Sequence, residues 1–146
     1  MPTYDLHFLR PRHGLPSLQG FVLPDGSELC TGIEKLSQRF LIELLTDVGS
    51  LPLQPTRGTR LLAEFRAGRI RTELDVITTF NFAASAAVSR LQLFESIRDP
   101  AEERIAQARL DRVVLRRQSA ELHITITSRA GTQRSLPLPI TTLARA

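Results

Sequence analysis

A strict alternation of apolar and polar residues late in the chain constrains the fold most. Between residues 122 and 127 the apolar members are Leu122, Ile124 and Ile126, and the polar members are His123, Thr125 and Thr127. A period of two is typical of a strand with one face buried and the other in water. The sequence therefore predicts a sheet here, whose apolar face must be covered by other elements or by a partner chain.

The run before it, Ile105 to Arg117, is rich in β-forming residues but less regular. Its apolar residues change parity part-way along, which predicts a β-bulge near Asp111 and Arg112. The tripeptide Gln118-Ser119-Ala120 separates the two runs. We expect the two runs to form a two-stranded antiparallel ribbon.

Three earlier segments show the three- and four-residue apolar spacing of helices. They are Ile33 to Thr46, Thr59 to Ala67 and Thr72 to Ile97. Gly49 is a natural stop for the first, Gly68 closes the second, and Asp99-Pro100 ends the third.

The third helix should bury one face against the ribbon, and the apolar residues on that face are Ile77, Phe80, Ala84, Val88, Leu91 and Phe94 or Glu95. The core expected from all these elements comprises Phe40, Leu44, Phe65, Ile77, Phe80, Leu91, Leu122, Ile124 and Ile126.

The two ends of the chain carry weaker strand signals. Thr3 to Leu9 is expected to be a short strand or an extended arm, broken by the prolines and the glycine of residues 10–16. Gly20 to Leu23 and Glu28 to Thr31 flank the turn sequence Pro24-Asp25-Gly26-Ser27, which predicts a small hairpin. Ser135 to Ile140 carries two prolines and is expected to be an edge strand or a tail along the surface.

Together these elements predict an α+β fold, with helices followed by an antiparallel β-ribbon. A chain of 146 residues, 42% of them hydrophobic, can build one ordinary core, so we expect one compact domain. Residues 1–31 would form an N-terminal arm and small hairpin, and residues 32–146 the α+β domain.

Residue usage argues against catalysis and against metal or cofactor binding. Cys30 is the only cysteine, and the three histidines, His7, His13 and His123, lack the spacing of metal ligands. Glu102 and Glu103 are adjacent, so on a strand they face opposite ways and do not form a glycosidase pair. No apolar run is long enough for a membrane span and no signal peptide is apparent, so no membrane contact is expected.

The charge leaves more than one class of partner open. The chain has a net charge of +4 and a pI near 10.5, and Lys35 is the only lysine among its 19 basic residues. Arginine suits planar contacts with both carboxylates and phosphates. The high pI favours nucleic-acid binding, but aromatic residues are only 5% and the arginines are scattered among acids. A nucleic-acid-binding module is therefore the alternative hypothesis and not the first. A self-contained scaffold of unspecified use is a third.

Three segments, in order along the chain, resemble motifs of a known family. Leu44-Leu45-Thr46-Asp47-Val48-Gly49 resembles its L-x-T-x-x-G helix end, and Pro55-Thr56-Arg57-Gly58-Thr59-Arg60-Leu61 its P-x-x-G-x-x-L segment. Glu102-Glu103-Arg104-Ile105 is similar to its Glu-Pro-Arg-Ile signature, with Glu103 in place of the proline. The family is that of the sheath-initiator, or lysozyme-like baseplate wedge, proteins of contractile bacteriophage tails and related injection systems. The resemblance covers about residues 32 to 128.

The resemblance implies a structural virion protein of the tail baseplate, made in the host bacterial cytoplasm. About six copies would surround the tail tube or hub, join baseplate wedge proteins, and template the first ring of the tail sheath protein. The expected mechanism is β-augmentation, in which a neighbour's arm adds to an open ribbon edge. Thr3 to Leu9 and Ser135 to Ile140 are rival occupants of that edge, and the prolines make the second a poor one.

The predicted site residues form two groups. The structural motif positions are Gly49, Gly58, Glu102 and Arg104. The partner-binding positions are Leu122, His123, Ile124, Thr125, Ile126, Thr127, Arg112 and Arg116. Simpler interpretations stand beside these. The glycines fit local turns, the arginines fit the wet face of a strand, and the charge pair is either solvated or a buried brace between helix and ribbon.

Overall fold

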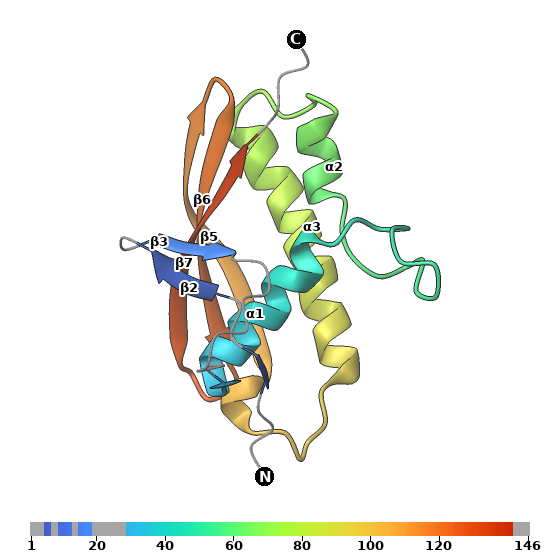
Figure 1. Cartoon of the computed structure of the whole chain (residues 1–146), viewed down its shortest axis with the longest axis vertical. Helices are drawn as coiled ribbons and strands as arrows, with labels where there is room; N and C mark the ends of the chain where they lie inside the picture. Colours follow the sequence, from blue (N-terminus) through green and yellow to red (C-terminus); the bar gives the residue numbers. More distant parts are fainter. Residues whose placement is uncertain (1–4, 7–8, 13–14, 19–28, 142–146) are drawn as a thin grey trace.

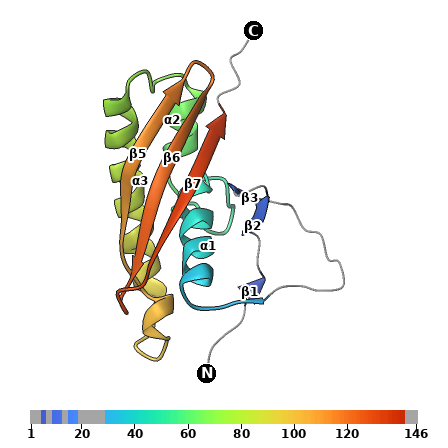
Figure 2. The same cartoon turned by 90° about the vertical axis from the view of Figure 1, so that its left-hand side faces the viewer.

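Three long strands form an antiparallel sheet, and the helices pack against one of its faces (Figures 1 and 2). This computed structural model describes residues 5–6, 9–12, 15–18 and 29–141. The helices are α1 (Gly32–Leu45), α2 (Leu61–Arg66) and α3 (Glu73–Phe94), and a short 3₁₀ helix, η1 (Ala101–Glu103), leads into the sheet. The strands are β5 (Ile105–Arg116), β6 (Ser119–Ser128) and β7 (Gln133–Thr141). The predicted α+β class and its three helices are confirmed.

The sheet has three strands in the order β5-β6-β7, where two were predicted. β6 pairs with β5 on one side, and on the other it pairs with β7 from Ser119 opposite Thr141 to Thr127 opposite Gln133. The predicted bulge is confirmed, because the register shifts between Leu110 and Arg112. The edge strand predicted at the C-terminal end is also confirmed, but the expectation that its prolines would make it a poor occupant of the ribbon edge is wrong.

Pro137 and Pro139 can belong to β7 because of where their nitrogens point. Proline has no N–H to donate, so in a paired strand it occupies positions whose nitrogen faces away from the neighbour. The two prolines are two residues apart, so their nitrogens point to the same side, away from β6. The main-chain groups of Leu136 and Leu138 point toward β6, and the side chains of these leucines are buried. The prolines therefore cost β7 no ladder hydrogen bond.

The core lies between the helices and the sheet, with Phe40 of α1, Phe80 of α3 and Ile124 of β6 fully buried in one cluster. Every residue of the predicted core belongs to this cluster except Ile77. The prediction that Ile77 is buried is wrong. Ile77 is 40% exposed because the neighbouring Val76 points inward in its place. The apolar stripe of α3 is thus rotated by one residue at its N-terminal end.

A capping box fixes the start of α3. The N–H of Asp75 donates to Oγ1 of Thr72, and the N–H of Thr72 donates to the Asp75 carboxylate. Hydrogen bonds to this carboxylate, first from the backbone of Arg71 and then from Thr72, lower the pKa of Asp75. The helix therefore begins at a defined residue, which sets the face that it turns to the core.

The N-terminal strands pair with one another. β1 (Asp5–Leu6) pairs with β4 (Leu29–Cys30), and β2 (Leu9–Arg12) pairs with β3 (Leu15–Leu18). The break predicted across residues 10–16 is wrong at residues 10–12 and 15–16, because Pro11 and Pro16 lie opposite each other in the β2-β3 ladder. Residues 13–14 lie outside the described residues.

The small hairpin predicted around residues 24–27 lies largely outside the described residues. Its second strand, where it is described, pairs with β1 as β4. Figure 2 shows β2 and β3 on the β7 side of the sheet, where β3 contacts β7. The division of the chain at residue 31 stays a prediction.

Candidate functional site

The two outer strands of the sheet differ in what they offer to a further strand. In an antiparallel ladder, the main-chain groups of alternate residues point to alternate sides. Since the two prolines of β7 lie opposite Glu121 and His123, these β6 residues direct their main chains toward β5. The β5-β6 register then shows which β5 residues direct their main-chain groups toward β6 and which direct them toward the outer edge.

The outer edge of β5 is open. The β5 residues whose N–H and C=O point away from β6 are Ala108, Leu110, Val113 and Leu115. No strand among the described residues pairs with this edge, and none of these residues is a proline. The β7 edge, by contrast, lacks a donor at Pro137 and at Pro139. Of the two edges, β5 is therefore the better template for an added strand.

β6, where a partner strand was expected to add, is closed on both sides. Thr125 pairs with Arg109 on β5 and with Ser135 on β7. The predicted partner-binding side chains of β6 that lie in the core are Leu122, Ile124 and Ile126, each fully buried. The edge that a partner could use therefore lies on an outer strand, and these three residues contribute packing.

Strand alternation directs His123, Thr125 and Thr127 away from the buried Leu122, Ile124 and Ile126, toward the sheet face that the helices leave uncovered (Figure 2). His123 lies there with its Nε2 atom 3.2 Å from a guanidinium nitrogen of Arg112 and 2.7 Å from the carboxylate of Glu121. Arg116 is exposed and Thr127 is half-buried. This face is therefore a surface of mixed charge rather than a block of positive charge.

A second polar cluster on this face ties the bulge of β5 to the other strands. The hydroxyl of Thr125 hydrogen-bonds the Asp111 carboxylate and also lies 2.8 Å from the Ser135 hydroxyl. Arg109 Nε donates to the same carboxylate at 2.7 Å. The Thr125 hydrogen bond, followed by the bond and charge of Arg109, holds the pKa of Asp111 below its ordinary value. The side chain of Thr125 thus joins all three strands.

A buried ion pair joins α1 to the start of the sheet. Lys35 Nζ lies 2.8 Å from the carboxylate of Glu103, and both side chains are less than a tenth exposed. The same carboxylate accepts the N–H of Gly32 at 3.2 Å. Because η1 leads directly into β5, this contact sets where the sheet begins relative to α1.

The structure gives this bracing role to Glu103, whereas the sequence interpretation gave it to Glu102 and Arg104. Glu102 is exposed, and Arg104 is half-buried with an Nε that has no hydrogen-bond partner among the described residues. Sequence reasoning treated Glu103 as a departure from a signature and as one half of a rejected glycosidase pair. No local signal pointed to Glu103, because its partner Lys35 lies outside the three- and four-residue apolar spacing of α1.

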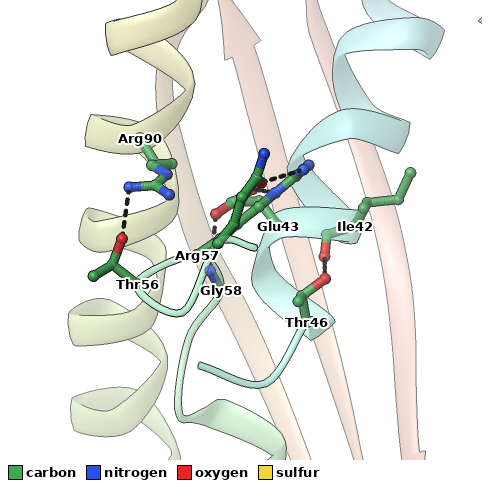
Figure 3. Close-up of polar contacts among 8 residues, drawn as sticks. Ile42, Glu43, Thr46, Thr56, Arg57, Gly58 and Arg90 are labelled. Atoms are coloured by element: carbon green, nitrogen blue, oxygen red, sulfur yellow. Dashed lines mark hydrogen bonds and ion pairs between the residues drawn. The ribbon is translucent and has the colours of Figure 1, made fainter. Parts of the chain in front are cut away.

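A second buried carboxylate holds the loop after α1. Glu43, 3% exposed, accepts the N–H of Gly58 at 3.0 Å and Nε of Arg57 at 2.9 Å (Figure 3). The hydroxyl of Thr59 donates to the carbonyl of Leu44, and its N–H donates to the carbonyl of Thr46. These contacts fold residues 46–59 back against the end of the helix.

The two predicted motif glycines have different roles in this loop. Gly58 has φ +98°, and a Cβ built there would lie 2.3 Å from the carbonyl oxygen of Thr46. Gly49 also has a positive φ, +84°, but a Cβ there would meet nothing within 4 Å. Gly58 is therefore required by close backbone approach, and Gly49 only by its backbone conformation.

A cleft of about 400 Å³ lies where this loop meets α1 and α3. Its lining residues are Arg39, Ile42, Glu43, Gln54, Arg57, Arg90, Leu91 and Phe94. Arg90 lies over the Phe94 ring, 5.6 Å from the centroid, and donates to Thr56 at 3.5 Å (Figure 3). Since Glu43 neutralises Arg57, Arg39 and Arg90 give the cleft its excess positive charge, which suits a carboxylate.

The arrangement offers binding groups rather than a clustered set of acids and bases. Within residues 5–6, 9–12, 15–18 and 29–141, no group of three or more His, Cys, Asp or Glu could hold a metal ion. Glu102 is exposed while Glu103 is buried against Lys35, so the two carboxylates do not face a common cleft. None of the helices in this part of the chain is long and apolar enough to cross a membrane.

Comparison with known proteins gives no family assignment. No protein-family model matches the chain, and no curated protein sequence matches it. Among solved structures, the chain is similar to a crystal structure of a "putative tail lysozyme" from Geobacter sulfurreducens. The two are 18% identical, the alignment covers 77% of this chain and 93% of that chain, and the TM-score is 0.43. At this level of similarity, the function has to be argued from the chain's own residues.

Proposed function

We propose that this protein is a structural component of a contractile tail baseplate. It joins wedge components around the tail tube and templates the first ring of sheath by β-augmentation. The observation that carries the proposal is the open edge of β5, where Ala108, Leu110, Val113 and Leu115 direct their main chains outward. An exposed edge of this kind invites addition of another chain, and in an assembly protein that property is useful.

The contrast with β7 supports a directed role for this edge. Proteins commonly protect an outer strand with proline, charge or a covering segment. β7 has two prolines and is contacted by β3, whereas β5 contains no proline. Protection of one edge alone leaves a single direction in which a neighbour's arm can extend the sheet.

The segments that carry the family resemblance also support the proposal, because each occupies a structurally constrained position. The residues around Gly49 end α1, and Gly58 lies under the Glu43 carboxylate. The segment Glu102 to Ile105 forms the turn into β5, where Glu103 pairs with Lys35. The segments that resemble the family therefore lie where α1 contacts its following loop and the start of β5, and these contacts position the β5 edge.

Nucleic-acid binding is the second candidate, and the high pI is the observation in its favour. Many arginines of the described residues are already paired with acids, including Arg57 with Glu43, Arg109 with Asp111 and Arg134 with Glu34. A basic stripe for a phosphate backbone would leave such arginines unpaired. An electrophoretic mobility shift that weakens steeply with salt would favour this candidate, and no shift would favour the baseplate role.

The direct test is Val113→Pro in bacteria that produce the particle. Proline at this position removes one outward N–H of β5 and leaves the β5-β6 ladder intact. We expect micrographs to show tubes and baseplates without sheath. Gln133→Pro is the matched control, because it removes an outward N–H from the β7 edge. Normally sheathed tails from the Val113→Pro mutant would contradict the proposal.

A further inference from the structure

The cleft between α1, α3 and the loop after α1 is built by segments that are distant in sequence. On α1, Arg39 is three residues from Ile42 and four from Glu43, so the three side chains share one face of that helix. On α3, Arg90 and Phe94 are four residues apart and share a face in the same way. With a volume of about 400 Å³, the cleft is within the range of roughly 300–1,000 Å³ that ligand sites occupy.

One positive charge of the cleft is already balanced within it. Arg57 donates from Nε to the Glu43 carboxylate at 2.9 Å, and from a terminal nitrogen to the side-chain oxygen of Gln54 at 3.2 Å (Figure 3). Arg57 is therefore held in place by residues of the cleft itself. Three arginines against one glutamate leave the lining with an excess of two positive charges.

The excess belongs to two half-buried arginines, one on each helix. The side chain of Arg39 makes no hydrogen bond or ion pair within the described part of the chain. The guanidinium of Arg90 lies over the Phe94 ring and donates to Thr56 at 3.5 Å, but no carboxylate of the described residues pairs with it. Its Nε is buried and has no hydrogen-bond partner there. Both cations therefore lack an anionic partner.

The chemistry of the lining indicates which anion would fit. Guanidinium groups form charge-assisted hydrogen bonds with carboxylates, and partial burial strengthens them because water screens the charges less. The same cleft also offers apolar surface, since Ile42 is 39% exposed and Phe94 is 69% exposed. A ligand that fills the cleft would thus combine a carboxylate with an apolar group.

We propose that this cleft binds an acidic segment of another protein. One Asp or Glu carboxylate of that segment is held between Arg39 and Arg90, and a neighbouring apolar side chain packs against Ile42 and Phe94. A peptide carries the two groups side by side, whereas a nucleic-acid backbone presents phosphates without an apolar neighbour. The Glu43 carboxylate in the lining also repels a doubly charged phosphate more than a single carboxylate.

This binding site is separate from the β5 edge that carries the baseplate proposal. Every lining residue of the cleft belongs to α1, to α3 or to the loop after α1. The acidic segment would bind through side chains, whereas the β5 edge would bind through main-chain groups. Failure of either proposal therefore leaves the other standing.

The test is an NMR titration of the ¹⁵N-labelled full chain with the peptide acetyl-Leu-Glu-Leu-amide, read at the arginine Nε–H signals. We expect the signals of Arg39 and Arg90 to shift, with a Kd on the order of 1 to 10 mM for so short a probe. Acetyl-Leu-Gln-Leu-amide is the matched peptide, because it has the same shape without the charge. It should bind at least ~10-fold more weakly.

Variants of the chain locate the site. Arg39→Gln should raise the Kd of the Glu peptide ~10-fold, and it should not disturb the fold, because the Arg39 side chain has no polar contact to lose in the described part. Arg90→Gln should have a similar effect, with circular dichroism to verify folding. Arg60→Gln is the matched control, since Arg60 is exposed and is not part of the cleft lining. It should bind like the wild type.

Three results would overturn the proposal. The first is equal binding of the Glu and Gln peptides, or no shift of either arginine up to about 20 mM peptide. The second is an Arg39→Gln variant that binds as tightly as Arg60→Gln. The third is inorganic phosphate that binds more tightly than the Glu peptide, which would replace the acidic segment by a phosphate-bearing ligand.

Discussion

Where α1 joins its following loop and the start of the sheet, the chain satisfies its own polar groups, whereas along the outer edge of β5 it leaves main-chain groups unpaired among the described residues. At the joints, Glu103 is buried against Lys35, and Glu43 accepts two donors from the loop after α1. At β5, the main-chain groups of Leu110 and Val113 point outward without a partner strand among the described residues. The comparison teaches that the polar contacts of this fold are concentrated where they position β5, and that the outer edge of β5 lacks them.

The comparison predicts two classes of variant. Changes at the joints should lower the free energy of unfolding of the isolated chain. Changes at the open edge of β5 should have a smaller effect on stability and reduce association. A joint variant that weakened association without loss of stability would break the distinction.

The largest expected effect is at Glu103. Glu103→Ala removes the carboxylate partner of a buried lysine, which should cost about 3 to 5 kcal/mol of unfolding free energy. Urea denaturation of the purified chain measures it. Glu102→Ala is the control, and because Glu102 is exposed it should change stability by less than about 0.5 kcal/mol. Equal losses in the two variants would mean that Glu103 does not brace the junction.

The two motif glycines give the next effect. Gly58→Ala should lower the unfolding free energy by more than about 3 kcal/mol. Its Cβ would clash with the Thr46 carbonyl oxygen, and its positive φ is unfavourable for alanine. Gly49→Ala meets no atom, so only the φ penalty of about 1 kcal/mol should remain. Thermal unfolding of both variants checks the order. A larger loss at Gly49 would show that the loop after α1 is held differently.

Val113→Pro sharpens the contrast between edge and ladder. As a purified chain it should lose no more than about 1.5 kcal/mol, because its N–H is not part of the β5-β6 ladder. Thr125→Pro removes an N–H that bonds to β5 and should lose about 3 kcal/mol or more. Denaturant titrations of the two chains would compare them. Similar losses would mean that the outward parity assigned to Val113 is wrong.

The smallest expected effect is on pH dependence at the bulge. The pKa of Asp111 is lowered in the folded chain, so its ionised form adds stability that is present above the unfolded value of 3.8. That stability is lost as the pH falls below 3.8 through the folded-state value. An NMR titration of the carboxyl should therefore give a pKa below 3.8, and Thr125→Val should raise it. A titration midpoint at or above 3.8 in the wild type would contradict the hydrogen bond from Thr125.

Elements with strong periodic patterns could be predicted from the sequence. The helical stripe through Phe40 and Leu44, the alternation from Leu122 to Ile126 and the bulge near Asp111 are all local patterns, and the structure confirms them. The face of α3 was predicted less well at Ile77, because adjacent apolar residues leave the rotation of a helix undetermined until its packing is known.

Features that depend on contacts distant in sequence could not be predicted. Prolines argue against a strand locally, but Pro137 and Pro139 are compatible with β7 because their nitrogens face the outer edge. Glu103 gains its role from Lys35, which lies 68 residues earlier, and no local pattern joins them. The candidate site was therefore predicted on the central strand of the sheet, whereas the open edge of the same sheet lies on β5.

Amide hydrogen exchange of the free chain and of the assembled particle, read by mass spectrometry, tests the central claim most directly. In the free chain, the outward amides of Ala108, Leu110, Val113 and Leu115 should exchange fast, while the amides of β6 are protected. In the particle, the outward β5 amides should become protected and the β7 edge should change little. Fast exchange along β5 in the sheathed particle would contradict the claim that a neighbour's strand adds there.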